Sequence, residues 1–358
     1  TDLIAIYAVF FIAYSLAQSF DVDGAGAGLS CLVSFFIITG RTAYYTAAAT
    51  DAATVSAMAT TYLGAKGLFS AMIIALIGAR IYVSVVKKGW VIKLPDSVPP
   101  NVANSFSSLI PAGIVVILFV VVRFLCTLTP YGDLHTMIFT IIQSNLMRFI
   151  GNNVWSWLFF NLMTNLLWFF GLHGGNIVGS ITNPIYTPLS LENLAAFQAG
   201  EKAMPYIITG AFGKSFTFGG VGSMFGLAIL MCFFAKSQQY KMLGKLSLPT
   251  TFFFINEPLL FGIPVVLNPM FFIPLMLVTP ILGTVTYFAM KVGICPIPHG
   301  VQIPWTTPPV INGFLQGGFG LAVWELLMVL ASIVLWYPFF KMGDDMALKE
   351  EVGATKAK

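Results

Sequence analysis

Charged residues are scarce in this sequence. Lysine, arginine, aspartate and glutamate make up 9% of its 358 residues, and 57% of the residues are hydrophobic. Soluble domains carry about 25% charged residues, so a chain of this size cannot cover a water-facing surface, which excludes a soluble globular protein. The apolar runs are continuous and do not alternate with polar residues, which argues against a transmembrane β-barrel. The composition therefore predicts an integral membrane protein made of helices.

Several sequence patterns that carry familiar chemistry are also missing. There is no GxxxxGK[ST] loop, so the chain does not power transport with an ATP site of this kind. No cluster of metal ligands and no Ser–His–Asp pattern is evident, and we expect no cofactor, no metal and no nucleic-acid partner. The cysteines are widely spaced, without a CxxC pair, and are predicted to be buried packing residues: Cys31, Cys126, Cys232 and Cys295.

Long stretches without any charge predict membrane-spanning helices, because an apolar helix of about 20 residues crosses the hydrocarbon core. Residues 134–150 mix apolar and polar side chains and are predicted to form either an interfacial helix or a shielded span. The predicted spans lie at about 3–20, 29–40, 62–86, 107–128, 153–172, 215–235, 264–290 and 319–340.

Lysines indicate the orientation of the chain, because cytoplasmic loops favour lysine and arginine. They follow three of the predicted helices, and we expect all three loops to be cytoplasmic. Residues 182–205 are rich in proline and asparagine and are predicted to form a loop or hairpin in or near water, facing outward. Residues 341–358 are predicted to be a charged cytoplasmic tail. The lysines concerned are Lys87, Lys88 and Lys93, then Lys236, Lys241 and Lys245, then Lys341, Lys349, Lys356 and Lys358.

Two proline-rich stretches, 247–264 and 296–313, do not fit simple spanning helices. Proline removes an N–H donor and breaks the interior of a helix. Irregular backbone at membrane depth is tolerated only where protein buries it or where it lines a watery cavity. Both stretches are therefore predicted to be re-entrant hairpins that line a polar site, as in transporters with interrupted helices.

The first hairpin carries an acid within the apolar sequence FFFINEPLLFGIP. A carboxylate that faces lipid costs about 2.5–3.5 kcal/mol on insertion scales, so Glu257 is expected to face a cavity or the protein interior. Asn256 beside it offers both a donor and an acceptor. The plainer alternative is that these two side chains only satisfy backbone groups of the hairpin around Pro258.

A second polar cluster is GLHGGN, residues 171–176, at the end of a charge-free helix. Its glycines, among them Gly174, permit close approach of the backbone. His173 can donate and accept hydrogen bonds, and Asn176 adds an amide. The plainer alternative is that His173 caps the helix end or packs there.

A carboxylate, an amide and an imidazole together suit a ligand with many hydroxyl groups, because each hydroxyl both donates and accepts. Aromatic side chains can cover the apolar face of a sugar ring. His299 and Trp305 in the second hairpin are further candidates for such contacts. Interface or packing roles are the alternative for the remaining tryptophans with this potential: Trp155, Trp157 and Trp168.

Four motifs resemble the membrane-embedded IIC component of sugar phosphotransferase systems, in its lactose, cellobiose and diacetylchitobiose branch. The similarity runs from about residue 60 to about residue 340. It is carried by FFFINEPLLFGIPVVLNP from residue 252, GLHG at 171–174, TYLGAKGLF at 61–69, and LPDSVPPNVANSFSSLIPA at 94–112.

The resemblance implies a homodimer in the bacterial cytoplasmic membrane. Residues 1–150 would be an interface domain that lacks a first membrane segment found in the family. Residues 151–340 would be a transport domain that holds one disaccharide between two hairpins and moves in an elevator-like fashion. By this resemblance Glu257 and His173 contact the sugar, Glu257 near the 6-hydroxyl that is phosphorylated, and Asn256 shapes the pocket. The phosphoryl donor would be a phosphocysteine on a separate IIB protein.

Two other functions remain open at this point. An ion-coupled secondary transporter would use Glu257 for proton coupling and deliver an unmodified sugar. A channel or a membrane scaffold would not need the paired broken hairpins. Which disaccharide is bound is not encoded in any one motif, although the β-linked group, such as diacetylchitobiose or cellobiose, is favoured.

Overall fold

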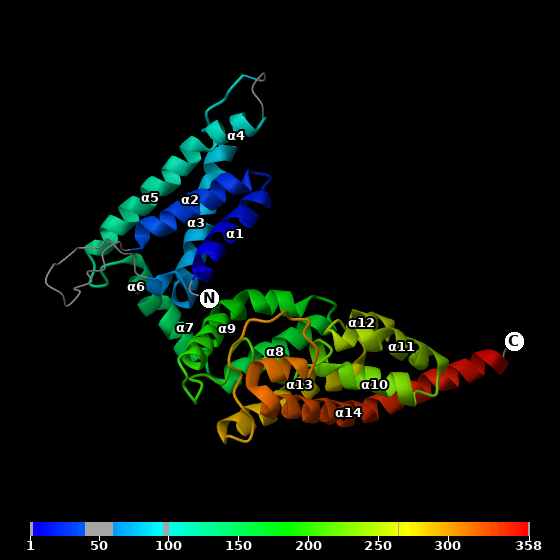
Figure 1. The fold of residues 1–358 in the computed structure, drawn as a ribbon. Helices are drawn as coiled ribbons and strands as arrows, with labels where there is room; N and C mark the ends of the chain where they lie inside the picture. The colour runs from blue at the N-terminus through cyan, green and yellow to red at the C-terminus, as the bar shows by residue number, and fades with distance from the viewer. Residues whose placement is uncertain (1–2, 40–59, 96–99, 264, 357–358) are drawn as a thin grey trace. The chain divides into compact units, whose positions relative to one another are not determined.

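The computed structural model describes residues 3–39, 60–95, 100–263 and 265–356. These residues form helices and connecting segments, without a β-strand among them (Figure 1). Two compact units divide the chain: unit 1, Thr1–Leu146, and unit 2, Met147–Lys358. The predicted all-α membrane architecture is confirmed by helical segments long and apolar enough to cross a bilayer: Leu68–Lys87, Ser105–Thr127, Pro269–Lys291 and Ile311–Gly353.

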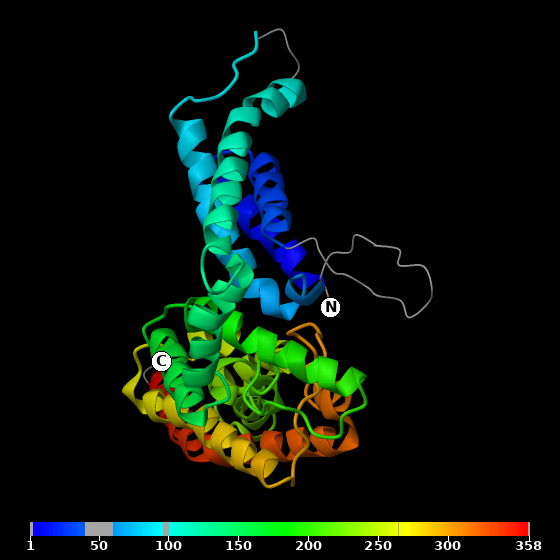
Figure 2. The same ribbon diagram turned by 90° about the vertical axis from the view of Figure 1, so that its left-hand side faces the viewer.

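Unit 1 is built on helices that run side by side (Figures 1 and 2). Small residues let them approach closely: a Cβ atom on Gly78 would lie 2.6 Å from the Cys31 sulfur. Asp23 caps the second helix by accepting the N–H groups of Ala25 and Gly26, a common way to satisfy the free donors of a first turn. The helices are α1 (Ile4–Gln18), α2 (Gly24–Ile38), α3 (Leu68–Lys87) and α5 (Leu109–Thr127), with the shorter α4 (Pro100–Ser107) and α6 (Leu134–Ile138). The short helix α7 (Ser144–Phe149) crosses the boundary between the two units.

A buried histidine ties several segments of unit 1 together. His135 in α6 is 2% exposed, and its Nε2 and Nδ1 atoms lie 3.0 and 2.7 Å from the hydroxyls of Thr39 and Ser70. The Tyr62 ring stacks on the imidazole at 4.9 Å. His135 lies outside the four candidate spans, and burial lowers its pKa to about 4. It is a neutral core residue that uses both ring nitrogens for structure.

Unit 2 contains the remaining helices. α13 lies against α8 and α14, and α10 contacts α11 and α14 (Figure 1). Trp157 on α8 packs edge-on against Phe212 and Phe216 at 5.3 and 5.2 Å, which makes it a core residue. The helices are α8 (Val154–Phe169), α9 (Gly174–Gln198), α10 (Phe225–Phe234), α11 (Gln238–Phe252), α12 (Glu257–Gly262), α13 (Pro269–Lys291) and α14 (Ile311–Lys356).

The predicted loop at 182–205 is wrong over most of its length. α9 continues through Pro184 and Pro188 to Gln198. A buried face with helical spacing, which includes Ile185 and Leu189, holds this helix against the rest of unit 2. The free energy gained by burying that face outweighs the cost of the two backbone hydrogen bonds that the prolines cannot form.

The second lysine group differs from the prediction, because Lys241 and Lys245 lie on α11 and not in a loop. Residues 341–356 continue α14 as a helix. The Asp344 carboxylate on this continuation accepts the N–H groups of Lys236 and Ser237 at 2.8 and 3.0 Å. The charged end of α14 therefore caps the start of α11.

The predicted span at 215–235 is helical only from Phe225, apart from short turns. Gly219, Gly220 and Gly222 before it have φ values of 69°, 75° and 72°, a region that favours glycine. Trp336 Nε1 donates to the Gly222 carbonyl at 2.9 Å. These glycines form a packed, irregular segment in place of the predicted first turns.

Candidate functional site

The first predicted hairpin is a helix, a short break and a second helix. α11 ends at Phe252, Phe254 has φ 68°, and α12 begins at Glu257. Asn256 is 3% exposed, and its Nδ2 donates to the Val221 carbonyl at 2.9 Å. It thus bonds the break to the glycine-rich segment before α10.

Glu257 differs from the neighbouring Asn256 in its burial and in its bonding. It lies in the first turn of α12, where negative charge is favourable, and it is half-buried. Within the described residues no hydrogen bond or ion pair engages its carboxylate. A half-buried carboxylate without a protein partner is available to a ligand.

The GLHGGN cluster forms the turn between α8 and α9. Gly171 has φ 78°, and a Cβ atom on Gly174 would overlap the Thr164 carbonyl. His173 caps α9, because its Nδ1 accepts the Asn176 N–H at 3.1 Å. A neutral imidazole that accepts at Nδ1 carries its proton on Nε2, so His173 presents an N–H donor. The Trp168 ring lies 4.5 Å from the imidazole.

Backbone and ring contacts join the turn between α8 and α9 to the segment that follows α12. The Leu267 N–H donates to the Phe169 carbonyl at 2.9 Å, and the rings of Phe169 and Phe272 are 4.8 Å apart. Among the described residues no direct hydrogen bond links His173 to Glu257. These contacts place Leu267 and Phe272 beside the turn, and no contact or cavity of the described residues joins His173 to Glu257 itself.

The second predicted hairpin lacks regular helix from residue 292 to residue 310. The His299 ring stacks on Phe197 at 3.9 Å, and the His299 backbone N–H donates to the Gln316 backbone carbonyl at 2.7 Å. Gly300 has φ 79°, and a Cβ atom there would overlap the Ser190 carbonyl on α9. Trp305 is 61% exposed. The hairpin is therefore packed on α9 near His299 and Gly300, whereas Trp305 is largely uncovered.

Glu325 on α14 is fully buried. Its carboxyl group accepts the Val310 N–H at 2.6 Å and the Asn312 side-chain amide. Glu325 therefore satisfies hydrogen-bond donors at the start of α14, and its role is structural. The backbone of α14 is kinked between these donors and Glu325, at Gly317 and Gly318. The described residues contain no group of three or more His, Cys, Asp or Glu side chains placed to hold a metal ion.

A polar cavity of about 250 Å³ lies between α9, residues 210–214 and the second hairpin. None of the residues predicted to bind sugar lines it. The sequence did contain a pattern that indicates one polar helical face, because Asn183, Thr187 and Ser190 are spaced i, i+4 and i+7. It was missed because residues 182–205 were predicted to be a loop. The polar lining is Asn183, Thr187, Ser190, Lys214, Gln302 and Gln316.

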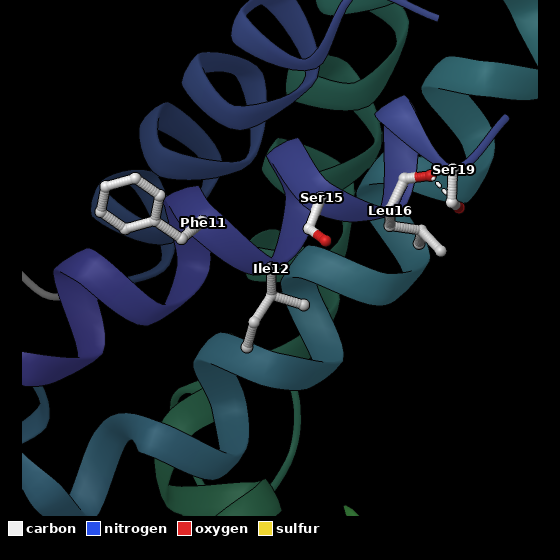
Figure 3. A pocket seen from close by; sticks show the side chains of 5 residues that line it. All are labelled: Phe11, Ile12, Ser15, Leu16 and Ser19. Carbon is white, nitrogen blue, oxygen red and sulfur yellow. Dashed lines mark hydrogen bonds between the residues drawn. The ribbon is translucent and has the colours of Figure 1, made fainter. Parts of the chain in front are cut away.

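Unit 1 has a larger but shallow groove of about 430 Å³ along α1 (Figure 3). It is lined by apolar and hydroxyl side chains, and the Ser19 hydroxyl is already bonded to the Leu16 carbonyl at 2.7 Å. Its chemistry does not suit a polar substrate. The lining residues are Phe11, Ile12, Ser15, Leu16 and Ser19.

This combination of apolar spanning helices with polar, broken hairpins defines a membrane transport protein. The family model for the phosphotransferase system EIIC proteins matches residues 1–279. The chain belongs to this family, and the resemblance noted from its motifs is confirmed.

Relatives and a solved structure agree with that assignment. The chain is 37% identical to the lichenan permease IIC component of Bacillus subtilis strain 168, over 98% of this chain and 78% of that protein. It is 37% identical to a cellobiose-specific EIIC component of Geobacillus stearothermophilus, over 98% and 79%. The crystal structure of the transporter ChbC, the IIC component from the N,N'-diacetylchitobiose-specific phosphotransferase system, matches with a TM-score of 0.92 and 36% identity, over 98% of this chain and 82% of that one.

Proposed function

We propose that this chain binds a β-linked disaccharide, such as cellobiose or diacetylchitobiose, in unit 2 and carries it across the bacterial cell membrane. Unit 2 moves in an elevator-like fashion, and a partner IIB protein phosphorylates the sugar at its 6-hydroxyl. The names of the similar proteins, which refer to lichenan, cellobiose and diacetylchitobiose, support this substrate class. The observation that carries the proposal is that unit 2 holds both a half-buried carboxylate without a protein partner, Glu257, and an imidazole fixed through Nδ1, His173.

His173 and Trp168 have complementary roles in this proposal. The bond from Asn176 to Nδ1 fixes the imidazole and leaves the Nε2 proton for a sugar hydroxyl. The Trp168 ring is buried beside the imidazole and holds it in place. Trp305, which is largely exposed, offers an apolar surface for the C–H face of a pyranose ring from the other hairpin. Gly174 and Asn176 shape the turn that presents these groups.

Glu257 is the proposed catalytic residue. The 6-hydroxyl oxygen attacks the phosphorus of the phosphocysteine, the S–P bond breaks, and the thiolate leaves. Glu257 accepts the hydroxyl proton as a general base, while positioning and charge stabilisation supply most of the acceleration. The product gains about two negative charges, and repulsion by a nearby carboxylate favours its release.

Replacement of Glu257 by Gln tests both roles. A hydrogen bond to a charged group contributes about 1.5–3 kcal/mol, so we expect a Kd for the disaccharide at least tenfold higher by calorimetry on the purified protein. Phosphorylation in vesicles supplied with IIB and phosphoenolpyruvate should fall further. Glu201, an exposed acid of unit 2, gives the matched control Glu201→Gln, which should leave both unchanged.

The same vesicles distinguish the alternative of ion coupling. Uptake of unmodified sugar that follows a proton gradient and needs no IIB would refute the phosphotransfer mechanism. Unchanged binding and phosphorylation in Glu257→Gln would remove Glu257 from the site.

We further infer that the protein is a homodimer joined through unit 1. α1 exposes large apolar residues, including Tyr7 and Phe11 at 61% and 60% exposure, and Phe11 also lines the groove of Figure 3. Light scattering of the purified protein in detergent should give twice the chain mass. A monomer at all concentrations would refute this inference.

A further inference from the structure

Two cations of unit 1 lie over the same aromatic ring. The Arg80 guanidinium carbon is 4.6 Å from the centre of the Phe20 ring, and Lys87 Nζ is 5.1 Å from that centre. Both side chains are exposed, and because they are spaced i and i+7 they share one face of α3. Since both lie over one ring, their positive charges are close together and repel each other.

No acid in the described part of the chain forms an ion pair with Arg80 or Lys87. Asp21 and Asp23 are the acids nearest to Phe20 in the sequence, and Asp23 uses both carboxylate oxygens to cap α2. Arg80 lies about two turns inside the end of α3, a helix able to span a bilayer. A long cation in such a position extends its charged end toward the membrane surface, so the pair of cations lies at the level of lipid headgroups.

The apolar groove along α1 runs toward these cations (Figure 3). Ile12 and Leu16 line it, and Phe20 continues their row at the same spacing of four residues. The Phe20 N–H bonds the carbonyl three residues before it at 3.0 Å, so the turn extends past the end of α1. Between Phe11 and Ser19 the groove follows about 12 Å of helix, close to the ~15 Å that one leaflet contributes to the hydrocarbon core.

This combination of an apolar groove with two cations at its end selects among possible ligands. A free oxyanion would neutralise the cations but would leave the groove empty. An apolar helix of a second copy would fill the groove but would leave the charges without a partner. A phospholipid with a net negative headgroup does both. Trp90 is 58% exposed, with Lys88 Nζ 5.6 Å from its ring centre, and exposed tryptophans are typical of the membrane–water interface.

We propose that α1 and α3 together bind an anionic phospholipid. Its phosphate lies between Arg80 and Lys87, above the Phe20 ring, and one acyl chain lies in the groove along α1. The lysines at this end of α3 assign the site to the cytoplasmic leaflet, where basic residues attract anionic lipids. The site lies within unit 1 and does not depend on the function proposed for unit 2.

The test measures lipid binding to the purified full chain in detergent. Native mass spectrometry gives apparent Kd values for phosphatidylglycerol and, separately, for phosphatidylcholine, whose headgroup is neutral overall. The double variant Arg80→Gln/Lys87→Gln removes both charges, and Ser15→Phe fills the groove but keeps them. The matched control is Lys241→Gln/Lys245→Gln, which removes two exposed charges from α11 in unit 2.

Each cation near an anionic lipid contributes about a fivefold gain in affinity. We therefore expect the wild type to bind phosphatidylglycerol about 25-fold more tightly than phosphatidylcholine, and the double variant to lose this preference. Ser15→Phe should weaken binding of both lipids severalfold, and the control should stay within about twofold of the wild type. An unchanged Tm without lipid reports intact folding; if the double variant does not fold, Lys87→Gln alone should show a fivefold loss.

Equal binding of the two lipids by the wild type, or equal losses in the double variant and the control, would overturn this inference. Displacement of phosphatidylglycerol by millimolar inorganic phosphate, with Ser15→Phe unaffected, would show a site for a free anion and not for a lipid. A dimer that Ser15→Phe converts to monomers, with lipid binding unchanged, would show that a second copy fills the groove. None of these outcomes bears on disaccharide binding, which is measured on unit 2 variants.

Discussion

Asn193 holds the second hairpin of unit 2 in place, and its removal should be costly. It is fully buried on α9. Its Nδ2 donates to the carbonyls of Tyr206 and Pro298 at 2.8 and 3.1 Å, and its Oδ1 accepts the Tyr206 N–H at 3.0 Å. One side chain thus joins a helix, the segment after it and a hairpin more than 100 residues further along the chain.

The change Asn193→Ala removes these three hydrogen bonds. Each contributes about 0.5–1.5 kcal/mol net, so the free energy of unfolding should fall by about 2–4 kcal/mol. For a unit of 150–250 residues, 1 kcal/mol lowers the Tm by about 2–4 °C. The expected decrease is therefore about 5–15 °C, measured by intrinsic tryptophan fluorescence of the purified protein in detergent.

A matched variant on the same helix is Asn183→Ala, whose side chain is exposed and makes no such bridge. Exposed substitutions usually change stability by less than about 0.5 kcal/mol. Equal Tm values for Asn193→Ala and the wild type, or equal losses in the two variants, would show that the bridge does not stabilise the hairpin.

Two further predictions concern buried ionisable groups. Because the pKa of His135 is lowered from 6.5 to about 4, the folded state favours the neutral ring; its contribution is complete above pH 6.5 and is lost as the pH falls from 6.5 to 4, by up to about 3 kcal/mol. Thermal unfolding across this range should become less pH-dependent in His135→Gln, and an unchanged profile would contradict the assignment. Glu325→Leu leaves the Val310 N–H unpaired and removes one of the two acceptors of the Asn312 amide, and it should cost about 2–4 kcal/mol in unfolding free energy. Glu325→Gln, which keeps an acceptor, should cost less, and equal losses in the two variants would argue against this role.

The membrane architecture and the two polar motifs were accessible from the sequence because both are local signals. Continuous apolar runs predict spans wherever they occur. An acid in such a run, as in the NEP triplet with Glu257, is conspicuous because burial of a charge is costly. GLHG was accessible for the same reason, since a histidine between glycines stands out at the end of an apolar helix.

The course of α9 and the polar cavity were not accessible, because both depend on distant parts of the chain. Pro184 and Pro188 predict a break, yet the helix continues because its apolar face is buried in unit 2. Asn193 looked like a loop residue, but its partners lie 13 and 105 positions away. The cavity is assembled from residues between positions 183 and 316, and no local pattern joins them.

The structural and functional interpretations of the two motifs do not exclude one another. In the first hairpin Asn256 bonds the backbone of the glycine-rich segment, whereas the carboxylate of the next residue has no partner among the described side chains. In the turn before α9, the two nitrogens of the His173 ring have different roles. Nδ1 caps the helix, and Nε2 is left free to donate. A rigid loop holds a ligand-binding group at a defined position without the loss of rotamer entropy that a mobile side chain would incur. In the proposed function, the structural bonds of Asn256 and of His173 Nδ1 would hold the Glu257 carboxylate and the His173 Nε2 atom in defined positions for a neutral sugar.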